Sequence, residues 1–190
     1  MSYFLNNLTV QKLIKDALQE DIGYGDITTN SLLEKDKSIQ ATVNSRSAGI
    51  VCGIDIVKNI FQILDPEIKF DLLVNDGEKI NENQDLLIIE GSARAILTGE
   101  RTALNFIQRM SAIATLTNQF QQSILPYKAK VTDTRKTTPN FRPFEKYAVK
   151  TGGGSPHRLG LFDCVMIKDN HIQLAGSITN AVKTIRNNIS

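Results

Sequence analysis

The spacing of apolar residues changes along the chain from helical to strand-like and back to helical. Residues 8–19 predict an amphipathic helix with one apolar stripe. That stripe contains Leu8, Leu13 near Val10, Ile14, Ala17 and Leu18. After a turn rich in glycine, short apolar runs at 39–43 and 50–52 indicate strands, and residues 55–64 predict a helix that an Asp-Pro pair ends.

Residues 68–91 alternate turn residues with short apolar runs, a pattern typical of a small antiparallel sheet. Lipoyl and biotinyl carrier hairpins share this pattern, and a carrier would be a binding module rather than an enzyme. A carrier displays its modified lysine in an exposed turn, whereas this stretch runs on into Gly91, Ser92, Ala93 and Arg94. We therefore favour a structural sheet.

The second half of the chain predicts a long helix followed by two strands with a helix between them. Residues 93–122 contain no proline, and their apolar residues recur at helical spacing, which predicts a largely buried helix. Residues 129–133 and 164–167 predict strands, and 142–151 predict the helix between them. The C-terminal stretch after residue 176 reads as one more helix.

Composition is that of a folded globular protein, with 41% hydrophobic and 22% charged residues in a chain of 190. We expect neither a membrane span nor an export signal, because no run of 18 apolar residues occurs and no basic patch precedes an apolar segment. Cys52 and Cys164 lie far apart in apolar segments, so we expect buried, reduced thiols and a cytoplasmic protein. Nothing predicts a nucleic-acid partner.

Positive charge is concentrated late in the chain. Residues 131–171 hold seven Lys and Arg against four Asp and Glu, although the whole chain has a net charge of only +2. Two strands joined through a helix should be parallel, so their C-terminal ends should lie at one edge of the sheet. The edge would gather five groups that are cationic or can become so: Arg135, Lys136, His157, Arg158 and Lys168. Such a cluster is best explained by an anionic ligand.

Other features near this cluster have both structural and functional interpretations. Glycines 152–154 are either a flexible connection or a phosphate-binding turn. Asp133 and Asp169 either pair with nearby cations or help to hold a divalent metal ion. Three residues with helical spacing around Glu145 are assigned to a solvated face without function, namely Arg142, Lys146 and Lys150.

No nucleophile with a neighbouring base is evident. Cys164 has no obvious partner, and the spacing of cysteine and histidine fits no zinc site. Neither a Walker A loop nor a dinucleotide-binding glycine pattern occurs. The basic cluster therefore favours a reaction that depends on positioning and charge neutralisation.

Four segments, in order along the chain, resemble the quinolinate phosphoribosyltransferase family, whose members are carboxylating nicotinate-nucleotide pyrophosphorylases. They are EDIGYGDITT (20–29), GERTALNFIQRMSAIATLT (99–117), DTRKTTPNFRPFEKYAVKTGGG (133–154) and HRLGLFDCVMIKDNHI (157–172). The resemblance covers nearly the whole chain, and four collinear motifs make a chance match very improbable.

The resemblance implies an α/β protein whose N-terminal α/β sandwich is followed by the first part of an incomplete α/β barrel. We place the sandwich and its connecting helix at 1–126 and the start of the barrel at 127–190. It also implies a homodimer that, in NAD biosynthesis, converts quinolinate and phosphoribosyl pyrophosphate into nicotinate mononucleotide, pyrophosphate and carbon dioxide with Mg²⁺. The pyridine nitrogen already carries a lone pair, so this reaction needs no general base.

The resemblance assigns roles to the basic residues. It implies that Arg135, His157 and Arg158 bind the carboxylates of quinolinate. It implies that Lys136 and Lys168 line the quinolinate and phosphoribosyl sites as catalytic residues, with Thr134 beside them as a substrate-binding residue.

Arg101 is expected to enter the site of the partner subunit and act there as a further catalytic, substrate-binding residue. This role comes from the resemblance alone, through the GERT sequence in the predicted long helix.

Family members continue with acidic residues for ribose and metal and a glycine-rich segment for the 5′-phosphate, whereas this sequence ends at Ser190. We therefore expect residues 1–190 alone not to catalyse the complete reaction at an appreciable rate. The alternatives are a related pyrophosphorylase that acts on another base and a non-catalytic fragment that retains anion binding or dimerisation.

Overall fold

The computed structural model describes residues 7–35 and 37–189, which fall into two compact units, Met1–His157 and Arg158–Ser190. The predicted division near residue 126 lies three residues beyond the end of the long helix at Ser123 and stays a prediction.

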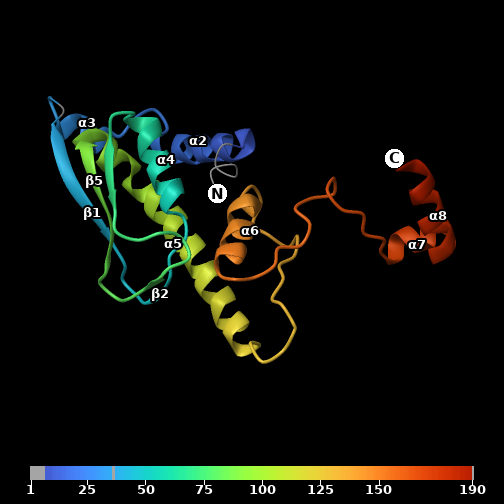
Figure 1. Cartoon of the computed structure of the whole chain (residues 1–190). Helices are drawn as coiled ribbons and strands as arrows, with labels where there is room; N and C mark the ends of the chain where they lie inside the picture. The colour runs from blue at the N-terminus through green and yellow to red at the C-terminus, as the bar shows by residue number, and fades with distance from the viewer. Residues whose placement is uncertain (1–6, 36, 190) are drawn as a thin grey trace. The chain divides into compact units, whose positions relative to one another are not determined.

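A three-stranded antiparallel sheet forms one layer of the first unit (Figure 1). Its order is β1 (Ser38–Asn44), β5 (Asp85–Ser92) and β3 (Lys69–Leu72), and a separate two-stranded sheet pairs β2 (Gly49–Ile50) with β4 (Lys79–Ile80). The antiparallel arrangement predicted for this region is confirmed. Strand β5 leads directly into a helix, so the exposed turn of a carrier domain is not formed there.

One face of the main sheet is apolar and covered. Ala41 and Phe70 flank Ile89, and Val43 lies opposite Leu87 on the same face, while the alternate residues of β1 are exposed. Leu87 and Ile89 are fully buried. Burying a side chain of this size contributes roughly 1.5–3 kcal/mol. The alternation therefore fixes which face of the sheet meets the helices.

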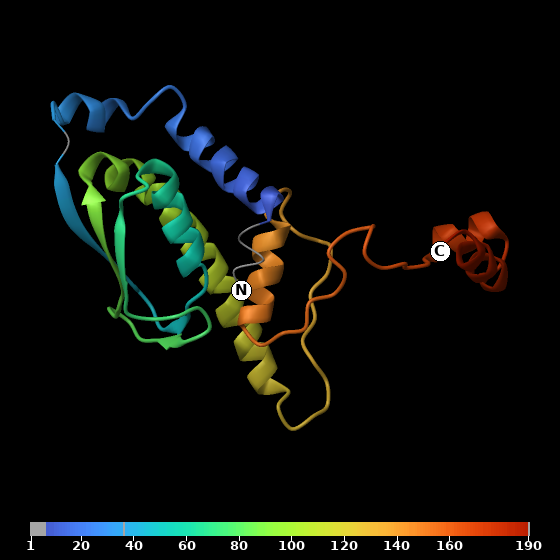
Figure 2. The same ribbon diagram turned by 45° about the horizontal axis from the view of Figure 1, so that its top comes forward.

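Two helices pack on each other over this sheet, as Figure 2 shows. They are α4 (Ile54–Leu64) and α5 (Ala93–Ser123), and both confirm the helices predicted from periodicity. One face of α5 is buried from Ala93 to Thr117, whereas Leu97 on its outer side is 43% exposed and Leu116 and Phe120 near its end are more than half exposed. The prediction of a largely buried helix therefore holds only for the part that the sheet and α4 cover.

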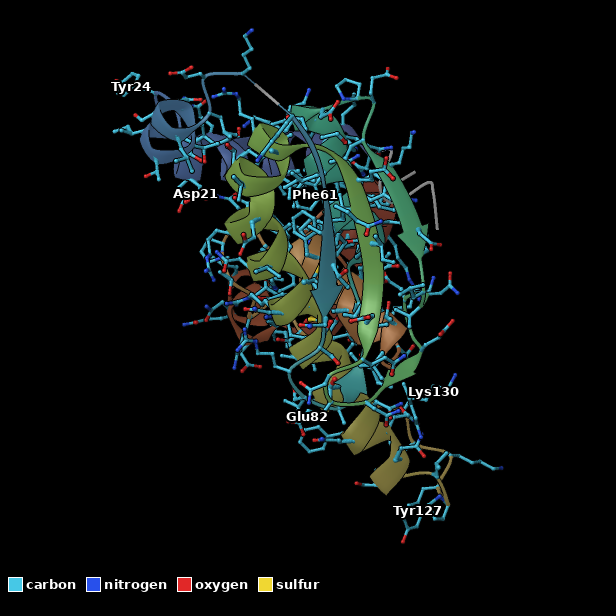
Figure 3. The ribbon with its side chains drawn as sticks, turned by 90° about the vertical axis from the view of Figure 1, so that its left-hand side faces the viewer. Asp21, Tyr24, Phe61, Glu82, Tyr127 and Lys130 are labelled. Carbon is cyan, nitrogen blue, oxygen red and sulfur yellow. The ribbon has the colours of Figure 1, made fainter. Side chains whose placement is uncertain are left out.

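The N-terminal segment forms α2 (Leu8–Ile22) and a short helix, α3 (Ile27–Leu32). The stripe of α2 is confirmed except at Leu8, which is exposed in the first turn. Asp26, which follows the glycine-rich turn, caps α3 by accepting a hydrogen bond from the Thr29 amide at 2.9 Å. Figure 3 shows Tyr24 beside these blue N-terminal helices and Tyr127 beyond the far end of α5.

Helix α6 (Arg142–Thr151) confirms the predicted helix and packs against α5. Three aromatic rings, Phe106, Phe141 and Phe144, join the two helices with centroid distances of 4.9 to 5.3 Å. Phe144 is fully buried. Aromatic pairs in such tilted or edge-on geometry contribute about 0.5–1.5 kcal/mol beyond their buried area. These aromatic contacts therefore hold α6 against α5.

A polar cluster ties the other side of α6 to the N-terminus of α4. The hydroxyl of Tyr147 donates to one carboxylate oxygen of Asp76 at 2.8 Å, and the other oxygen accepts from the amides of Gly53 and Ile54 at 2.9 Å. Burial outweighs these bonds and raises the pKa of the Asp76 carboxyl above its ordinary value. Burial, reinforced by the Asp76 charge, also raises the pKa of Tyr147 and of the Cys52 thiol.

The raised pKa of Asp76 predicts a pH-dependent contribution to stability. Because the folded pKa exceeds the unfolded one, this contribution is fully present below about pH 3.9 and is lost as pH rises through the folded pKa. Asp76→Asn keeps an oxygen for the two amides but cannot ionise. In urea unfolding from pH 4 to 8, the free energy of unfolding of the parent minus that of the variant should fall, by about 1.4 kcal/mol for each tenfold by which folding weakens the acidity of this carboxyl. A difference that grows with pH would contradict this.

The second unit contains two helices, α7 (Asp169–Ala175) and α8 (Ile178–Asn188). Helix α8 was predicted, whereas residues 169–171 were expected to follow a strand and instead begin α7. Nothing in the described ranges forms a strand at 129–133 or 164–167, so the two predicted strands are wrong there. A strand requires a ladder of bonds to a neighbour, and 129–133 has only isolated ones, such as that from the Ser155 amide to the Val131 carbonyl at 2.8 Å.

The two cysteines differ in their surroundings. Cys52 is buried, as predicted, but Cys164 is exposed because the segment around it is not a covered strand. Neither forms a disulfide. Over the described parts of the chain, no helix combines the length and the apolar character needed to cross a bilayer.

Candidate anion-binding site

The basic segment, residues 133–138, runs alongside α6 and is anchored at its far end by side chains. Arg142 donates to the Thr137 hydroxyl at 2.9 Å, and the Thr138 amide donates to Glu145 at 3.3 Å. Arg109 from α5 reaches the same place, where it bonds the Thr138 hydroxyl and forms an ion pair with Glu145 at 3.0 Å. The segment is irregular in backbone form yet fixed by its neighbours.

The near end of the basic segment is fixed by a buried ion pair. Lys146 of α6 lies 2.5 Å from one carboxylate oxygen of Asp133, and their side chains are only 6% and 9% exposed. The same oxygen accepts from the His157 amide at 2.8 Å, and Lys146 also donates to the His157 carbonyl at 3.0 Å. The assignment of Lys146 to a solvated face is therefore wrong, because Asp133 and His157 cover it.

Two polar atoms in this segment are buried without a hydrogen-bond partner among the described residues: Nε of Arg135 and Oδ2 of Asp133. A buried donor without an acceptor costs about 1–3 kcal/mol, more when it is charged. The guanidinium of Arg135 is thus partly desolvated and has unused donor capacity. Lys136 is exposed beside it, and its amide donates to the Thr134 hydroxyl at 3.0 Å.

The glycine turn after α6 is structural, which corrects the phosphate-binding interpretation. The amides of Gly152, Gly153 and Gly154 donate to carbonyls in the last turn of α6 at 2.9 to 3.0 Å, so they are not available to a phosphate. A methyl group on Gly152 would overlap the carbonyl oxygen of Ala114 and lie 2.8 Å from Cβ of Thr117. These glycines allow the end of α6 to approach the backbone of α5 closely.

The predicted site residues lie in both compact units. The first unit brings Thr134, Arg135, Lys136 and the exposed His157 together around Asp133. Arg101 is exposed on α5, two turns before Arg109. Its role remains a prediction.

In the second unit, Arg158 donates to the Cys164 carbonyl at 2.8 Å. Lys168 is exposed at the start of α7, where its amide donates to Nδ1 of His171 at 2.9 Å. His171 therefore caps the N-terminus of α7. Whether Arg158 and Lys168 act with Arg135 and Lys136 stays a prediction.

Lys146 and Arg109 are the residues near this site that the sequence did not single out. Only one weak feature of the sequence indicates that Lys146 is buried. Its helix carries large apolar or aromatic side chains on several sides, so the face left for exposed polar residues is narrow. Its partner Asp133 lies 13 positions away, beyond any helical spacing rule. Only the fold brings the two together.

The described residues do not form a metal site by themselves. Nowhere within 7–35 or 37–189 do three His, Cys, Asp or Glu side chains gather as metal ligands. The bonded oxygen of Asp133 is taken by Lys146 and the His157 amide, so its charge is already paired. The donor set here does not fit a magnesium ion held by protein ligands alone.

Comparison with known families gives two matches that follow one another along the chain. Residues 26–111 match the family model of the N-terminal domain of quinolinate phosphoribosyl transferase, and residues 113–190 match that of its C-terminal domain. Together the two matches cover residues 26–190 except position 112.

Relatives and solved structures agree with these matches. A probable nicotinate-nucleotide pyrophosphorylase [carboxylating] of Synechocystis sp. is 43% identical over 96% of this chain and 61% of its own. The structure of the nicotinate-nucleotide pyrophosphorylase from Francisella tularensis aligns with a TM-score of 0.87 at 44% identity, covering 94% of this chain and 63% of that one. NadC from Streptococcus pyogenes aligns with a TM-score of 0.90 at 37% identity, over 98% and 67%. These structures confirm the predicted mixed α/β class, and the chain spans about three fifths of the Synechocystis relative.

Proposed function

Since the chain belongs to the quinolinate phosphoribosyltransferase family, we propose that the protein converts quinolinate and phosphoribosyl pyrophosphate into nicotinate mononucleotide, pyrophosphate and carbon dioxide. The observation that carries this proposal is the 43% identity, over 96% of the chain, to a relative named as a carboxylating nicotinate-nucleotide pyrophosphorylase. The basic segment supports it independently, because both substrates are anions. The activity would serve NAD biosynthesis.

Arg135 is the residue of the first unit best suited to hold a quinolinate carboxylate. Its guanidinium is planar, permanently charged and able to donate two parallel bonds to a carboxylate. Its buried Nε has no acceptor among the described residues, so an anion placed there would satisfy it. We propose that His157 and Arg158 bind the carboxylates with it, that Lys136 and Lys168 line the quinolinate and phosphoribosyl sites, and that Thr134 binds substrate beside them.

The chemistry then needs positioned cations rather than a base. The lone pair of the pyridine nitrogen attacks the anomeric carbon of the ribose as the bond to pyrophosphate breaks, and pyrophosphate leaves with that electron pair. Lys136 beside Arg135 can stabilise the charge of the departing oxygen. The ring nitrogen now carries a positive charge, which stabilises the electron pair left on carbon 2 when carbon dioxide departs. A proton from solvent then completes nicotinate mononucleotide.

Magnesium ion remains a proposed requirement of this reaction. The described residues do not by themselves supply a set of metal ligands. Mg²⁺ in phosphoryl sites commonly keeps several waters and binds substrate phosphates with one or two carboxylates. Pyrophosphate oxygens of the substrate could provide ligands of that kind.

We also propose a cytoplasmic homodimer in which Arg101 contributes to the site of the partner subunit. Arg101 is exposed on α5, as a residue that crosses between subunits must be. Activity that returns when inactive Arg101→Ala and Lys136→Ala subunits are mixed would demonstrate this sharing.

The cytoplasmic location rests on the two unpaired cysteines.

Turnover by the protein expressed from its complete coding sequence tests the function directly. With phosphoribosyl pyrophosphate and Mg²⁺, quinolinate labelled in its 2-carboxyl group should yield labelled carbon dioxide and nicotinate mononucleotide in equal amounts. Nicotinate should be a poor substrate, because it lacks the second carboxylate. Equal use of nicotinate, or consumption of quinolinate without carbon dioxide release, would favour a related pyrophosphorylase and contradict the proposal.

A further inference from the structure

Lys146 is the one lysine in the described residues whose side chain is buried, with 5% of its surface exposed. Its ammonium group has two oxygen partners, Asp133 at 2.5 Å and the His157 carbonyl at 3.0 Å. Both partners lie in irregular segments, 13 and 11 positions away. A single side chain of α6 therefore fixes two stretches of backbone that have no regular structure of their own.

The bonds close into a small network around one oxygen atom. Oδ1 of Asp133 accepts from both Lys146 and the His157 amide, so it links the two segments directly as well. Burying two charges is costly, and well-packed apolar residues often stabilise a fold equally well. The buried Lys146–Asp133 pair is thus better explained by the positions that it gives the two segments than by a contribution to the free energy of folding.

The helix that carries Lys146 is itself held on two sides. Phe144 packs into the aromatic cluster with α5, and Tyr147 bonds to Asp76 at the N-terminus of α4. Lys146 lies between these two residues, so its backbone position is defined by the sandwich. Lys146 can therefore hold the segments that it bonds in a defined position relative to the sandwich.

We infer that Lys146 is a positioning residue of the anion-binding site. Through Asp133, Lys146 sets the path of the basic segment, which carries Arg135 two positions later. Through the His157 carbonyl, it also sets the position of the His157 side chain. The role in binding rests on the proposed function, because it supposes that Arg135 and His157 contact quinolinate. The mechanical part of the inference, that Lys146 holds both segments, does not depend on the ligand.

Lys146→Met tests the inference, with Lys150→Met as the matched control. Lys150 is an exposed lysine one turn further along α6, so its loss removes the same charge from the same helix. In the full protein, hydrogen–deuterium exchange should become about tenfold faster in residues 131–138 and 155–158 of the Lys146 variant and stay unchanged in β5. The dissociation constant for quinolinate should rise about tenfold by calorimetry. Lys150→Met should change neither quantity.

Asp133→Asn covers the case in which Lys146→Met fails to fold. It keeps an acceptor for the His157 amide but removes the charge that holds Lys146, so exchange should again rise only in the two segments. Lys146→Arg retains the charge and should recover part of the protection. Two results would overturn the inference. One is exchange in the Lys146→Met variant that matches Lys150→Met. The other is exchange that rises equally in β5 and α5 in both the Lys146→Met and the Asp133→Asn variants. If the parent bound no quinolinate, the proposed function would fail while exchange still decided the positioning role.

Discussion

Replacing Arg135 by alanine should weaken quinolinate binding by about 10- to 100-fold, since a hydrogen bond to a charged group contributes roughly 1.5–3 kcal/mol. The guanidinium is half-buried, and its Nε has no acceptor among the described residues, so in our proposal its main partner is the substrate carboxylate. Isothermal titration of parent and variant with quinolinate measures the loss. Arg158→Ala should have a similar effect.

Two controls make the result specific. Nicotinate has one carboxylate fewer than quinolinate, so its already weak binding should change much less in the Arg135 variant. Arg46 is an exposed arginine in the loop before β2, and Arg46→Ala should leave the affinity for quinolinate unaltered. Unchanged quinolinate affinity in both Arg135→Ala and Arg158→Ala would show that the carboxylate assignment is wrong.

Replacing Gly152 by alanine should destabilise the protein by about 1–3 kcal/mol or more, the usual cost of forcing extra atoms into a packed interior. The added methyl group would overlap the backbone oxygen of Ala114, which belongs to the buried part of α5 and cannot rotate away. Either α6 or α5 must then shift. Urea unfolding, followed by circular dichroism, measures the change in the free energy of unfolding.

Gly154→Ala is the matched comparison for this change. Its methyl group would meet side-chain carbons of Val149 and Thr117 at 2.8 and 2.9 Å, with the Val149 carbonyl oxygen at 3.0 Å. Side-chain ends move more easily than backbone, so the loss of stability should be smaller than at Gly152. A cost at Gly152 that is no larger than at Gly154 would be inconsistent with backbone contact as the cause.

Periodicity and turn residues alone predict most of the regular structure. Apolar spacing indicates which face of an element is covered. It therefore predicts the antiparallel strands and the helices α2, α4, α5, α6 and α8. The family resemblance was also available from sequence, since its motifs are local runs of residues. Arg135 and Lys136 lie in one of these motifs, whereas the sheet edge predicted to gather them is absent, because the described residues form neither of its two strands.

Burial, by contrast, was decided by tertiary packing. Lys146 was assigned to solvent from the polar residues around it, yet Asp133 and the His157 backbone cover it. Cys164 was expected to be buried by its apolar neighbours and is exposed. In both cases the partners that determine exposure lie outside the window that a local pattern samples.

Strand formation and glycine function depended on non-local partners in the same way. Residues 129–133 have strand-like composition, but a strand exists only where a neighbour supplies a ladder of hydrogen bonds, and here the bonds to Ser155 and Gln121 are isolated. Glycines 152–154 suit phosphate binding by composition, whereas their amides are used by α6 and Gly152 fits against Ala114. The sequence by itself determined most of the regular elements, the family and the basic segment. Only the tertiary structure decided that a buried lysine on α6 fixes this segment, because that contact joins residues whose separation follows no local period.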